Sequence, residues 1–162
     1  MDTYLSAVRC PDRDGYLLPV EPLERGSAWQ CDRCGKEVTE QSVDDRISQV
    51  KADGEKMSMA LSWQEWEDYL NITLANELHP DHWIAQNVKL VIVQLLSTRE
   101  KLDTLEKIKR SLELCENYLK VYDKVSPGYT KWRGHLLELQ SSATLKLSET
   151  LHEKVQRPGL TS

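Results

Sequence analysis

The sequence predicts a mainly α-helical protein that begins with a small zinc-ribbon-like module. Within residues 1–38 lie three of the six prolines, three of the seven glycines and three of the four cysteines, a composition typical of loops and hairpins. From residue 39 onwards, apolar residues recur every three or four positions almost to the end, which is the period of amphipathic helices. We therefore expect a module at 1–38, an antiparallel, tetratricopeptide-like array of about five helices at 39–157, and a tail at 158–162.

The composition is that of an ordinary globular protein and argues against several classes of function. Hydrophobic residues make up 40% and charged residues 29% of the 162 positions, and no apolar run approaches the roughly 20 residues of a membrane-spanning helix. The net charge of −5 offers no cationic surface for a nucleic acid. The first residues lack the basic and apolar regions of a secretory signal, so we expect an intracellular protein, in the cytoplasm, the nucleus or both, with reduced cysteines. Neither a membrane nor a nucleic acid is an expected partner.

Three cysteines of the first module have the spacing of an incomplete zinc site. Cys31 and Cys34 form a Cys-x-x-Cys pair, whose thiolates can hold one face of a tetrahedral metal, and Gly35 permits a tight turn around the ion. Cys10 lies where a second such pair would begin, but Arg13 occupies the position of its partner and cannot ligate zinc. We expect structural zinc at Cys10, Cys31 and Cys34, because a module below about 40 residues buries too little apolar area to fold unaided.

The fourth ligand and the chemistry of this cluster have alternatives. Asp12 and Asp14 are the nearest oxygen donors in the sequence, and either could complete the metal site. If neither ligates, the module has lost its metal, keeps three reduced thiols and is held by docking against the helices. A redox pair at Cys31 and Cys34 is a competing interpretation. Thioredoxin-type pairs start a helix after a strand, however, whereas here a proline-rich loop precedes the pair and a glycine follows it.

The first two helices have different signals in the sequence. A weakly amphipathic helix is expected within residues 39–58, with Gly54 interrupting it. The next helix has a clearer start, because Ser62 and Glu65 fit a capping box, and it is expected to end at His79-Pro80. Their apolar positions are Val43, Ile47 and Val50 in the first helix, and Trp66, Leu70, Thr73, Leu74 and Leu78 in the second.

Three further helices follow. Asp81 is the expected N-cap of the third, the fourth has the most regular period and is expected to stop at Ser126-Pro127-Gly128, and the fifth ends before Pro158. The short connections predict antiparallel neighbours packed as helical hairpins. The apolar positions are Ile84, Val88, Val91 and Leu95 in the third helix, Leu105, Ile108, Leu112, Cys115, Leu119 and Tyr122 in the fourth, and Tyr129, Trp132, Leu136, Leu139, Ala143, Leu147 and Leu151 in the fifth.

The rest of the chain shows no catalytic signature. It contains no phosphate loop, no Gly-x-Ser-x-Gly elbow and no His-Glu-x-x-His zinc motif. Cys115 occupies a core position of the most regular helix, so we interpret it as a buried apolar side chain and not as a nucleophile. We therefore expect a chain that catalyses no reaction alone. The tryptophans at helical positions are expected mainly in the core, and they are Trp63, Trp66, Trp83 and Trp132.

Five segments resemble a known family. Tyr4–Cys10, Gly15–Leu23 and Trp29–Gly35 look like the segment that follows the SET domain in the arthropod branch of the SET- and MYND-domain proteins. Leu78–Trp83 and Val125–Gly134 resemble the Leu-His-Pro-x-His and Pro-Gly signatures of that family's C-terminal helical domain. The order and spacing of these segments extend the resemblance over nearly the whole chain.

The resemblance implies a family of protein-lysine methyltransferases that use S-adenosylmethionine, in which this helical region packs across the SET fold beside the substrate cleft. The family's methyl-donor contacts, its Asn-His-Ser-Cys segment, its catalytic tyrosine and its MYND zinc finger lie upstream, and none of them is in this sequence. Only Cys10, Cys31 and Cys34 are carried over, as zinc ligands.

The leading hypothesis is therefore a non-catalytic C-terminal portion of such a protein, a short isoform or an incomplete gene model, which acts as a helical scaffold for a protein partner. One alternative is a piece that supports methyl transfer only when it is joined to an upstream SET domain. A second alternative is a stand-alone zinc-dependent nucleic-acid-binding module, against which the acidic balance of the chain argues.

Overall fold

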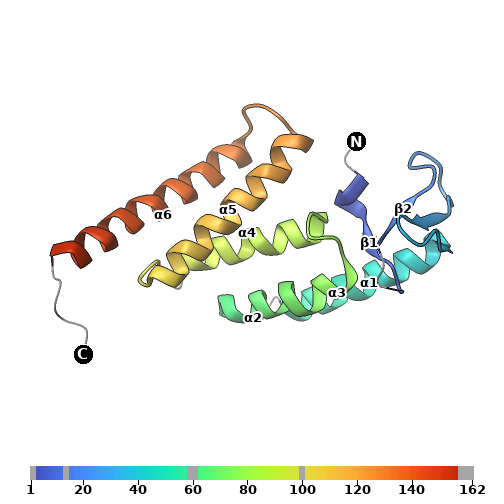
Figure 1. Cartoon of the computed structure of the whole chain (residues 1–162), viewed down its shortest axis with the longest axis horizontal. Helices are drawn as coiled ribbons and strands as arrows, with labels where there is room; N and C mark the ends of the chain where they lie inside the picture. The colour runs from blue at the N-terminus through green and yellow to red at the C-terminus, as the bar shows by residue number, and fades with distance from the viewer. Residues whose placement is uncertain (1–2, 13–14, 58–61, 99–100, 157–162) are drawn as a thin grey trace. The chain divides into compact units, whose positions relative to one another are not determined.

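The computed structural model describes residues 3–12, 15–57, 62–98 and 101–156, and 68% of the structure is helical. The described residues form five helical segments and a small antiparallel sheet at the N-terminal end (Figure 1). The mainly α-helical fold class predicted from the sequence is therefore confirmed.

Four short strands form the sheet, in the order β1-β2-β3-β4, and every neighbouring pair is antiparallel. One 3₁₀ turn, η1 (Thr3–Ser6), precedes them. Leu17 and Cys31 lie opposite one another in neighbouring strands and are both buried, so they point to the same covered face of the sheet. The strands are β1 (Val8–Arg9), β2 (Tyr16–Pro19), β3 (Trp29–Cys31) and β4 (Glu37–Val38).

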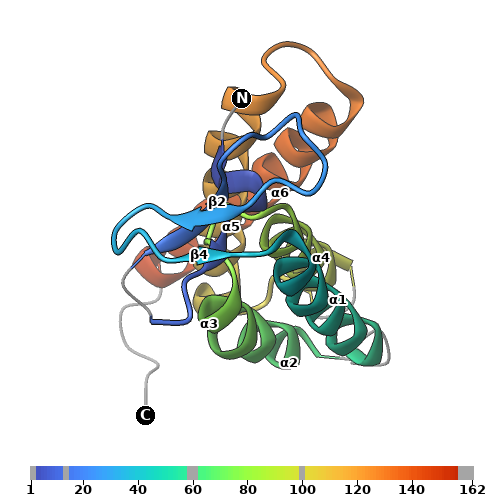
Figure 2. The ribbon, with the colours of Figure 1, turned by 90° about the vertical axis from the view of Figure 1, so that its right-hand side faces the viewer.

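Helix α1 (Glu40–Met57) follows β4 almost directly (Figure 2). It continues through Gly54, so the expected interruption at this glycine is wrong. A Cβ atom at Gly54 would lie 3.1 Å from the hydroxyl oxygen of Tyr69, and that hydroxyl donates to the carbonyl of Val50 at 2.7 Å. The glycine therefore leaves room for a buried hydrogen bond between two helices and does not end the helix.

The second helical segment has three consecutive parts. Ser62 is the N-cap of α2 (Trp63–Asp68): its side chain accepts from the backbone of Glu65, whose carboxylate accepts from the backbone of Ser62. The predicted capping box is therefore confirmed. The chain continues as a π-helix, η2 (Tyr69–Leu74), and ends as α3 (Ala75–Glu77).

The sheet and these helices are joined by an arginine at their centre. Arg46 of α1 donates from Nη1 to the backbone carbonyl of Arg9 at 2.8 Å and from Nη2 to the Glu77 carboxylate at 2.7 Å. A single guanidinium therefore connects the end of β1, the middle of α1 and the end of α3, which is the kind of multiple contact for which its planar fork is suited.

Strand β1 also contacts the segment that leaves α3. Val8 pairs with Leu78 in an isolated antiparallel bridge, and the backbone N–H of His79 donates to the carbonyl of Ala7 at 3.0 Å. Ala7, Val8 and Leu78 are all buried. The module that looks independent in the sequence therefore shares its buried surface with the helices that follow.

Helix α4 (Trp83–Thr98) starts one residue later than a cap at Asp81 would require. His82 occupies the capping position, because its Nδ1 accepts from the backbone N–H of Ile84 at 3.1 Å and its carbonyl accepts from Gln86 at 2.9 Å. Histidine is an uncommon N-cap, so the sequence pattern did not indicate His82, and the expectation of Asp81 as the cap is wrong.

The last two helices form an antiparallel hairpin (Figure 1). They are α5 (Leu105–Val125) and α6 (Lys131–Gln156), both close to the predicted spans. Ile108 of α5 and Leu136 and Ala143 of α6 are completely buried, so the three-and-four spacing correctly identified part of the face that meets a neighbour. The same spacing was wrong at the ends of the fifth helix, where Tyr129 is fully exposed and Leu151 is 48% exposed.

The tryptophans divide differently from the prediction. Trp63 is buried, but Trp83 is 43% exposed and Trp132 is 56% exposed, so the core assignment of these two is wrong. Both lie in the first turn of a helix, where apolar spacing does not ensure that another element covers the side chain. The ring of Trp83 instead carries the Lys51 ammonium 5.3 Å from its centre, a cation–π contact.

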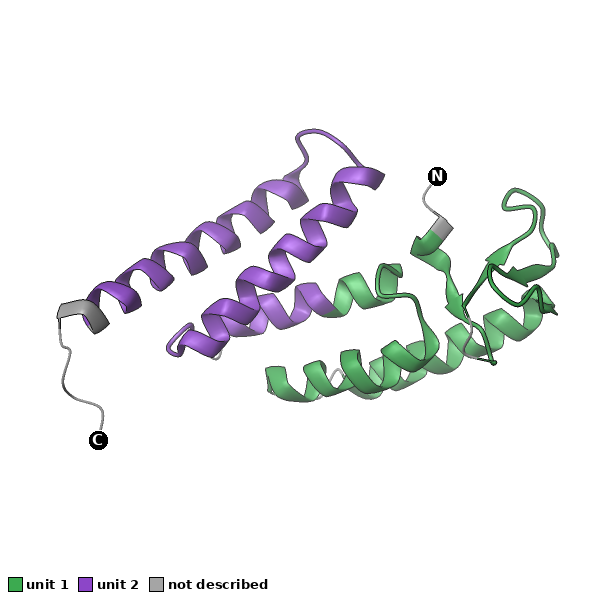
Figure 3. Ribbon diagram, in the orientation of Figure 1, with its two compact units in different colours: residues 1–88 green, residues 89–162 purple. Residues whose placement is uncertain are grey.

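The chain divides into two compact units, residues 1–88 and 89–162, and the boundary falls within α4 (Figure 3). The sheet belongs to the first unit together with α1, α2, η2 and α3, whereas α5 and α6 belong to the second. Among the described helices, none has the combination of length and apolar character that crossing a membrane requires.

Candidate metal centre

The Cys-x-x-Cys pair lies in a tight turn between β3 and β4. Cys31 is the last residue of β3, and its backbone N–H donates to the carbonyl of Lys36 across the turn at 2.9 Å. Gly35 has φ of 70°, a left-handed conformation that glycine adopts without a Cβ clash, and its N–H donates to the carbonyl of Cys31 at 3.2 Å. The tight turn predicted at Gly35 is therefore confirmed.

Strand pairing brings the third cysteine to this turn. Cys10 follows β1, and its backbone N–H donates to the carbonyl of Gly15 at 2.9 Å, which closes the connection to β2. Because β2 lies between β1 and β3, the residue after β1 reaches the end of β3. The sulfurs of Cys10, Cys31 and Cys34 all lie within 4.8 Å of one another, and those of Cys10 and Cys34 are 3.6 Å apart.

These sulfur positions fit a zinc ion. With zinc–sulfur bonds of about 2.3 Å, two sulfurs of a tetrahedral site are about 3.8 Å apart. The Cys10–Cys34 separation of 3.6 Å is close to that edge, and the third sulfur lies within reach of the same ion. The three predicted ligands therefore form one cluster whose geometry and donor type suit a tetrahedral thiophilic metal.

The two buried thiols of the cluster differ in their pKa. Burial raises the pKa of Cys10 to about 11, and the neighbouring sulfurs of Cys34 and Cys31 add to the effect. Burial also disfavours the thiolate of Cys31, but its pKa is lowered because the backbone N–H groups of Cys34 and Arg33 and the two other thiols donate to its sulfur. The thiolate form is therefore less disfavoured at Cys31 than at Cys10.

The fourth ligand stays open. The Asp12 carboxylate is half exposed and pairs with the Lys36 ammonium at 3.2 Å, and the cluster of ligand atoms among the described residues does not include it. Asp14 and Arg13 lie outside the described residues. Asp32, which no pattern in the sequence singled out, accepts at Oδ1 from the backbone N–H of Tyr16 at 2.8 Å and lies 3.9 Å from the Cys31 sulfur, but the cluster among the described residues does not include it either.

Gly15 lies against the turn so closely that a side chain would not fit. A Cβ atom there would overlap Oδ1 of Asp32 and would lie 2.9 Å from Cγ of Arg33. We expect Gly15→Ala to lower the free energy of unfolding by about 1–3 kcal/mol, because overpacking displaces the bond between Asp32 and the backbone. Urea denaturation measures this effect.

Gly134 provides the matched control for that substitution. It lies in the first turn of α6, where its N–H donates to the carbonyl of Thr130, and a Cβ atom there would meet nothing within 4 Å. Gly134→Ala should therefore raise the free energy of unfolding by up to about 1 kcal/mol through helix propensity. Equal effects of the two substitutions would contradict the close approach at Gly15.

The competing interpretations of the cysteines receive less support from the geometry. Cys31 ends a strand and is followed by a turn, so it lacks the helix N-terminus that lowers the pKa of the first cysteine in thioredoxin-type pairs. Cys115 is completely buried in α5, and burial raises its pKa to about 11. Its interpretation as a core side chain is consistent with both observations.

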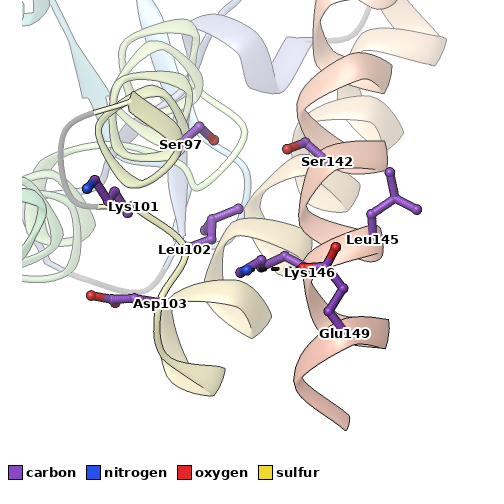
Figure 4. A pocket seen from close by; sticks show the side chains of 8 residues that line it. All are labelled: Ser97, Lys101, Leu102, Asp103, Ser142, Leu145, Lys146 and Glu149. Atoms are coloured by element: carbon purple, nitrogen blue, oxygen red, sulfur yellow. Dashed lines mark hydrogen bonds and ion pairs between the residues drawn. The ribbon is translucent and has the colours of Figure 1, made fainter. Parts of the chain in front are cut away.

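A hollow in the second unit has a different chemical character (Figure 4). Its volume is about 520 Å³, and side chains of both charge signs line it. Two ion pairs neutralise part of this charge, Lys146 with Glu149 at 3.0 Å and Lys107 with Asp103 at 3.1 Å. The lining contains no cysteine or histidine, so it offers no thiol or imidazole ligand for zinc. The lining residues are Ser97, Lys101, Leu102, Asp103, Ser142, Leu145, Lys146 and Glu149.

The resemblance to SET- and MYND-domain proteins rests on the short segments quoted above. In comparisons with known proteins, no protein-family model matches this chain, and no curated protein matches it either.

Proposed function

We propose that this chain is a non-catalytic scaffold that binds a protein partner through its helices, with an N-terminal module stabilised by structural zinc. In this proposal the sheet is a zinc ribbon, the helices are a tetratricopeptide-like array, and the chain corresponds to the C-terminal portion of a SET- and MYND-type protein. The thiol cluster supports the zinc, and a group of exposed aromatic side chains supports the partner.

The observation that supports binding of a protein partner is an exposed patch at the turn between α5 and α6. The turn patch consists of Val125, Tyr129 and Trp132, which are 48%, 107% and 56% exposed. Aromatic residues are enriched at the centres of protein interfaces, where tryptophan and tyrosine supply much of the binding energy. Three large apolar side chains exposed within eight residues are therefore suited to a protein contact.

The charge around the turn patch indicates the chemistry of the partner. Residues 119–138 contain four lysines or arginines, one aspartate and one glutamate, a local net charge of 4 − 2 = +2 in a chain of net charge −5, and Arg133 pairs with Asp123. A pocket of about 520 Å³ beside Trp132 is lined by Lys131, Gly134, His135 and Glu138 as well. An acidic segment with one apolar anchor residue would place the anchor beside Trp132 and its carboxylates near the lysines.

We expect Trp132→Ala to abolish partner capture by the 162-residue chain expressed in cells. Removal of an interface tryptophan typically weakens binding at least tenfold, which is about 1.4 kcal/mol. Proteins captured by the wild-type chain are identified, and the dissociation constant of each is then measured with purified components.

Leu145→Ala is the matched control, because Leu145 is 67% exposed on the same helix but lies outside the turn patch. This variant should retain the partner with unchanged affinity. An identical set of captured proteins for wild type and Trp132→Ala would remove the turn patch from the proposal. Circular dichroism of both variants checks that α6 is still folded.

A second function is favoured by the incomplete ligand set. Three thiols leave one position of a tetrahedral zinc site for a ligand from outside the described residues. This arrangement suits a piece that completes its metal site, and supports S-adenosylmethionine-dependent methyl transfer, only when joined to a SET domain. Calorimetry of the chain with S-adenosylmethionine gives a test of the first function. Binding of this compound by the chain alone would contradict a purely scaffolding role.

A further inference from the structure

Two sulfurs of the thiol cluster are close enough to form a bond with each other. The sulfurs of Cys10 and Cys34 are in hydrogen-bond contact at 3.6 Å, and the two residues are 24 positions apart in the sequence. Cys10 is buried whereas Cys34 is exposed to solvent. The cluster therefore combines a solvent-accessible thiol with a buried thiol that could resolve its oxidation.

We infer that Cys10 and Cys34 form a disulfide under peroxide, and that this disulfide and zinc exclude each other, so that the cluster is a redox-controlled metal site. The inference rests on the zinc site proposed above and adds a modification of two of its ligands. A disulfide sulfur is not a thiolate, so the oxidised cluster keeps only Cys31 as a metal ligand.

Cys34, and not Cys31, is the cysteine expected to pair with Cys10, because Cys34 is the one that can move. A disulfide has a sulfur–sulfur distance of about 2.05 Å, so the two sulfurs must approach by about 1.5 Å. Cys34 lies in the turn after β3, outside the strands, and can provide this shift. Cys31 is held within β3, where it pairs with Leu17 and its N–H donates to the Lys36 carbonyl. Pairing of Cys10 with Cys34 therefore disturbs the sheet less than pairing that moves Cys31.

The reaction is balanced with hydrogen peroxide as the oxidant. The exposed Cys34 thiol reacts first and becomes a sulfenic acid, with release of one water. The Cys10 sulfur then attacks the Cys34 sulfur, and the hydroxyl group leaves with the Cys10 proton as a second water. In total, two thiols lose two electrons and two hydrogens to one peroxide, and one disulfide and two waters are formed.

The test uses the full chain loaded with zinc and treated with hydrogen peroxide. Free zinc is followed with a chromogenic chelator, and the disulfide is mapped by mass spectrometry without reduction. We expect one zinc released for each Cys10–Cys34 disulfide formed, and recovery of zinc binding after dithiothreitol. Cys115 is the internal control, because it is completely buried in α5 and should stay reduced. Cys115→Ala should behave as the wild type.

The possible results separate this inference from the proposed zinc site. A zinc-loaded protein whose product is a Cys31–Cys34 disulfide, or one that keeps its zinc with Cys10 and Cys34 joined, would overturn the inference and leave the zinc site in place. A protein that never binds zinc but forms the Cys10–Cys34 disulfide would refute the zinc site and the exclusion, while the thiol pairing would stand. Zinc release accompanied only by sulfinic acid would overturn the pairing.

Discussion

Replacing Cys31 by serine should abolish zinc binding and lower the free energy of unfolding of the first unit. A metal that binds only the folded chain adds about 4 kcal/mol at a free concentration one thousand times its dissociation constant. Serine is a poor zinc ligand, and Cys31 is the buried thiol whose pKa the backbone N–H groups of Cys34 and Arg33 lower. Metal analysis of purified protein, with about one zinc per wild-type chain, and urea denaturation at fixed free zinc measure the two effects.

Loss of zinc in the Cys31→Ser variant should not unfold the whole first unit. Val8 is bridged to Leu78, and Arg46 joins β1 to α1 and α3, so the helices hold part of the sheet when the metal is absent. Cys115→Ala is the control and should retain one zinc per chain, because Cys115 lies in α5 of the other unit. Zinc-free wild-type protein with unchanged stability would contradict the structural role of the metal.

Acidification from pH 6.5 to pH 4 should destabilise the protein through His82. Burial lowers the pKa of this histidine from 6.5 to about 4, and the nearby charges of His79 and Lys51 act in the same direction. Its Nδ1 accepts the backbone N–H of Ile84, so the buried neutral imidazole caps α4. In the neutral ring that accepts at Nδ1 the hydrogen is on Nε2, which has no hydrogen-bond partner among the described residues, so an added proton must go to Nδ1 and would break the cap.

The sign of the effect follows from proton linkage. Between pH 6.5 and pH 4 the unfolded chain binds a proton at His82 and the folded chain does not, so stability falls as the pH falls. The difference between the two pKa values corresponds to about 3 kcal/mol at and below pH 4, and the contribution is complete above pH 6.5. His82→Asn keeps a side-chain oxygen that can cap α4 but cannot titrate, so its stability should depend less on pH in this range.

The measurement is the difference between the two proteins, because acid also protonates the cysteine ligands in both. Free energies of unfolding are determined at several pH values with the same free zinc. His152→Asn, a substitution of an exposed histidine on α6, should leave the wild-type profile unchanged. Parallel profiles for wild type and His82→Asn would show that burial of His82 does not control acid stability.

Local signals in the sequence predicted the helices well. The capping box of Ser62 and Glu65, the turn at Gly35 and the regular spacing of Ile108 in α5 and Leu136 in α6 each depend on residues within one or two turns of chain. Such interactions are encoded where they occur, so they can be recognised without knowledge of the fold.

Several assignments failed where the deciding neighbour lies far away in the sequence. Gly54 looked like a helix interruption, but Tyr69 requires the space at that position. Trp83 and Trp132 have core spacing, yet each lies in the first turn of its helix and about half of its surface is exposed. Asp81 looked like a better cap than His82, whose ring nitrogen makes the bond instead.

By itself, the sequence determined the helical class, the start of α2 and the three candidate thiol ligands, because periodicity, caps and cysteine spacing are properties of short segments. Only the tertiary structure decided that Cys10 lies 3.6 Å from Cys34, since that contact depends on β2 pairing with both β1 and β3. It also decided that Asp12 turns to Lys36 and that no described residue covers Tyr129 and Trp132. Contacts between distant residues depend on how elements pack, and no short segment of sequence contains that information.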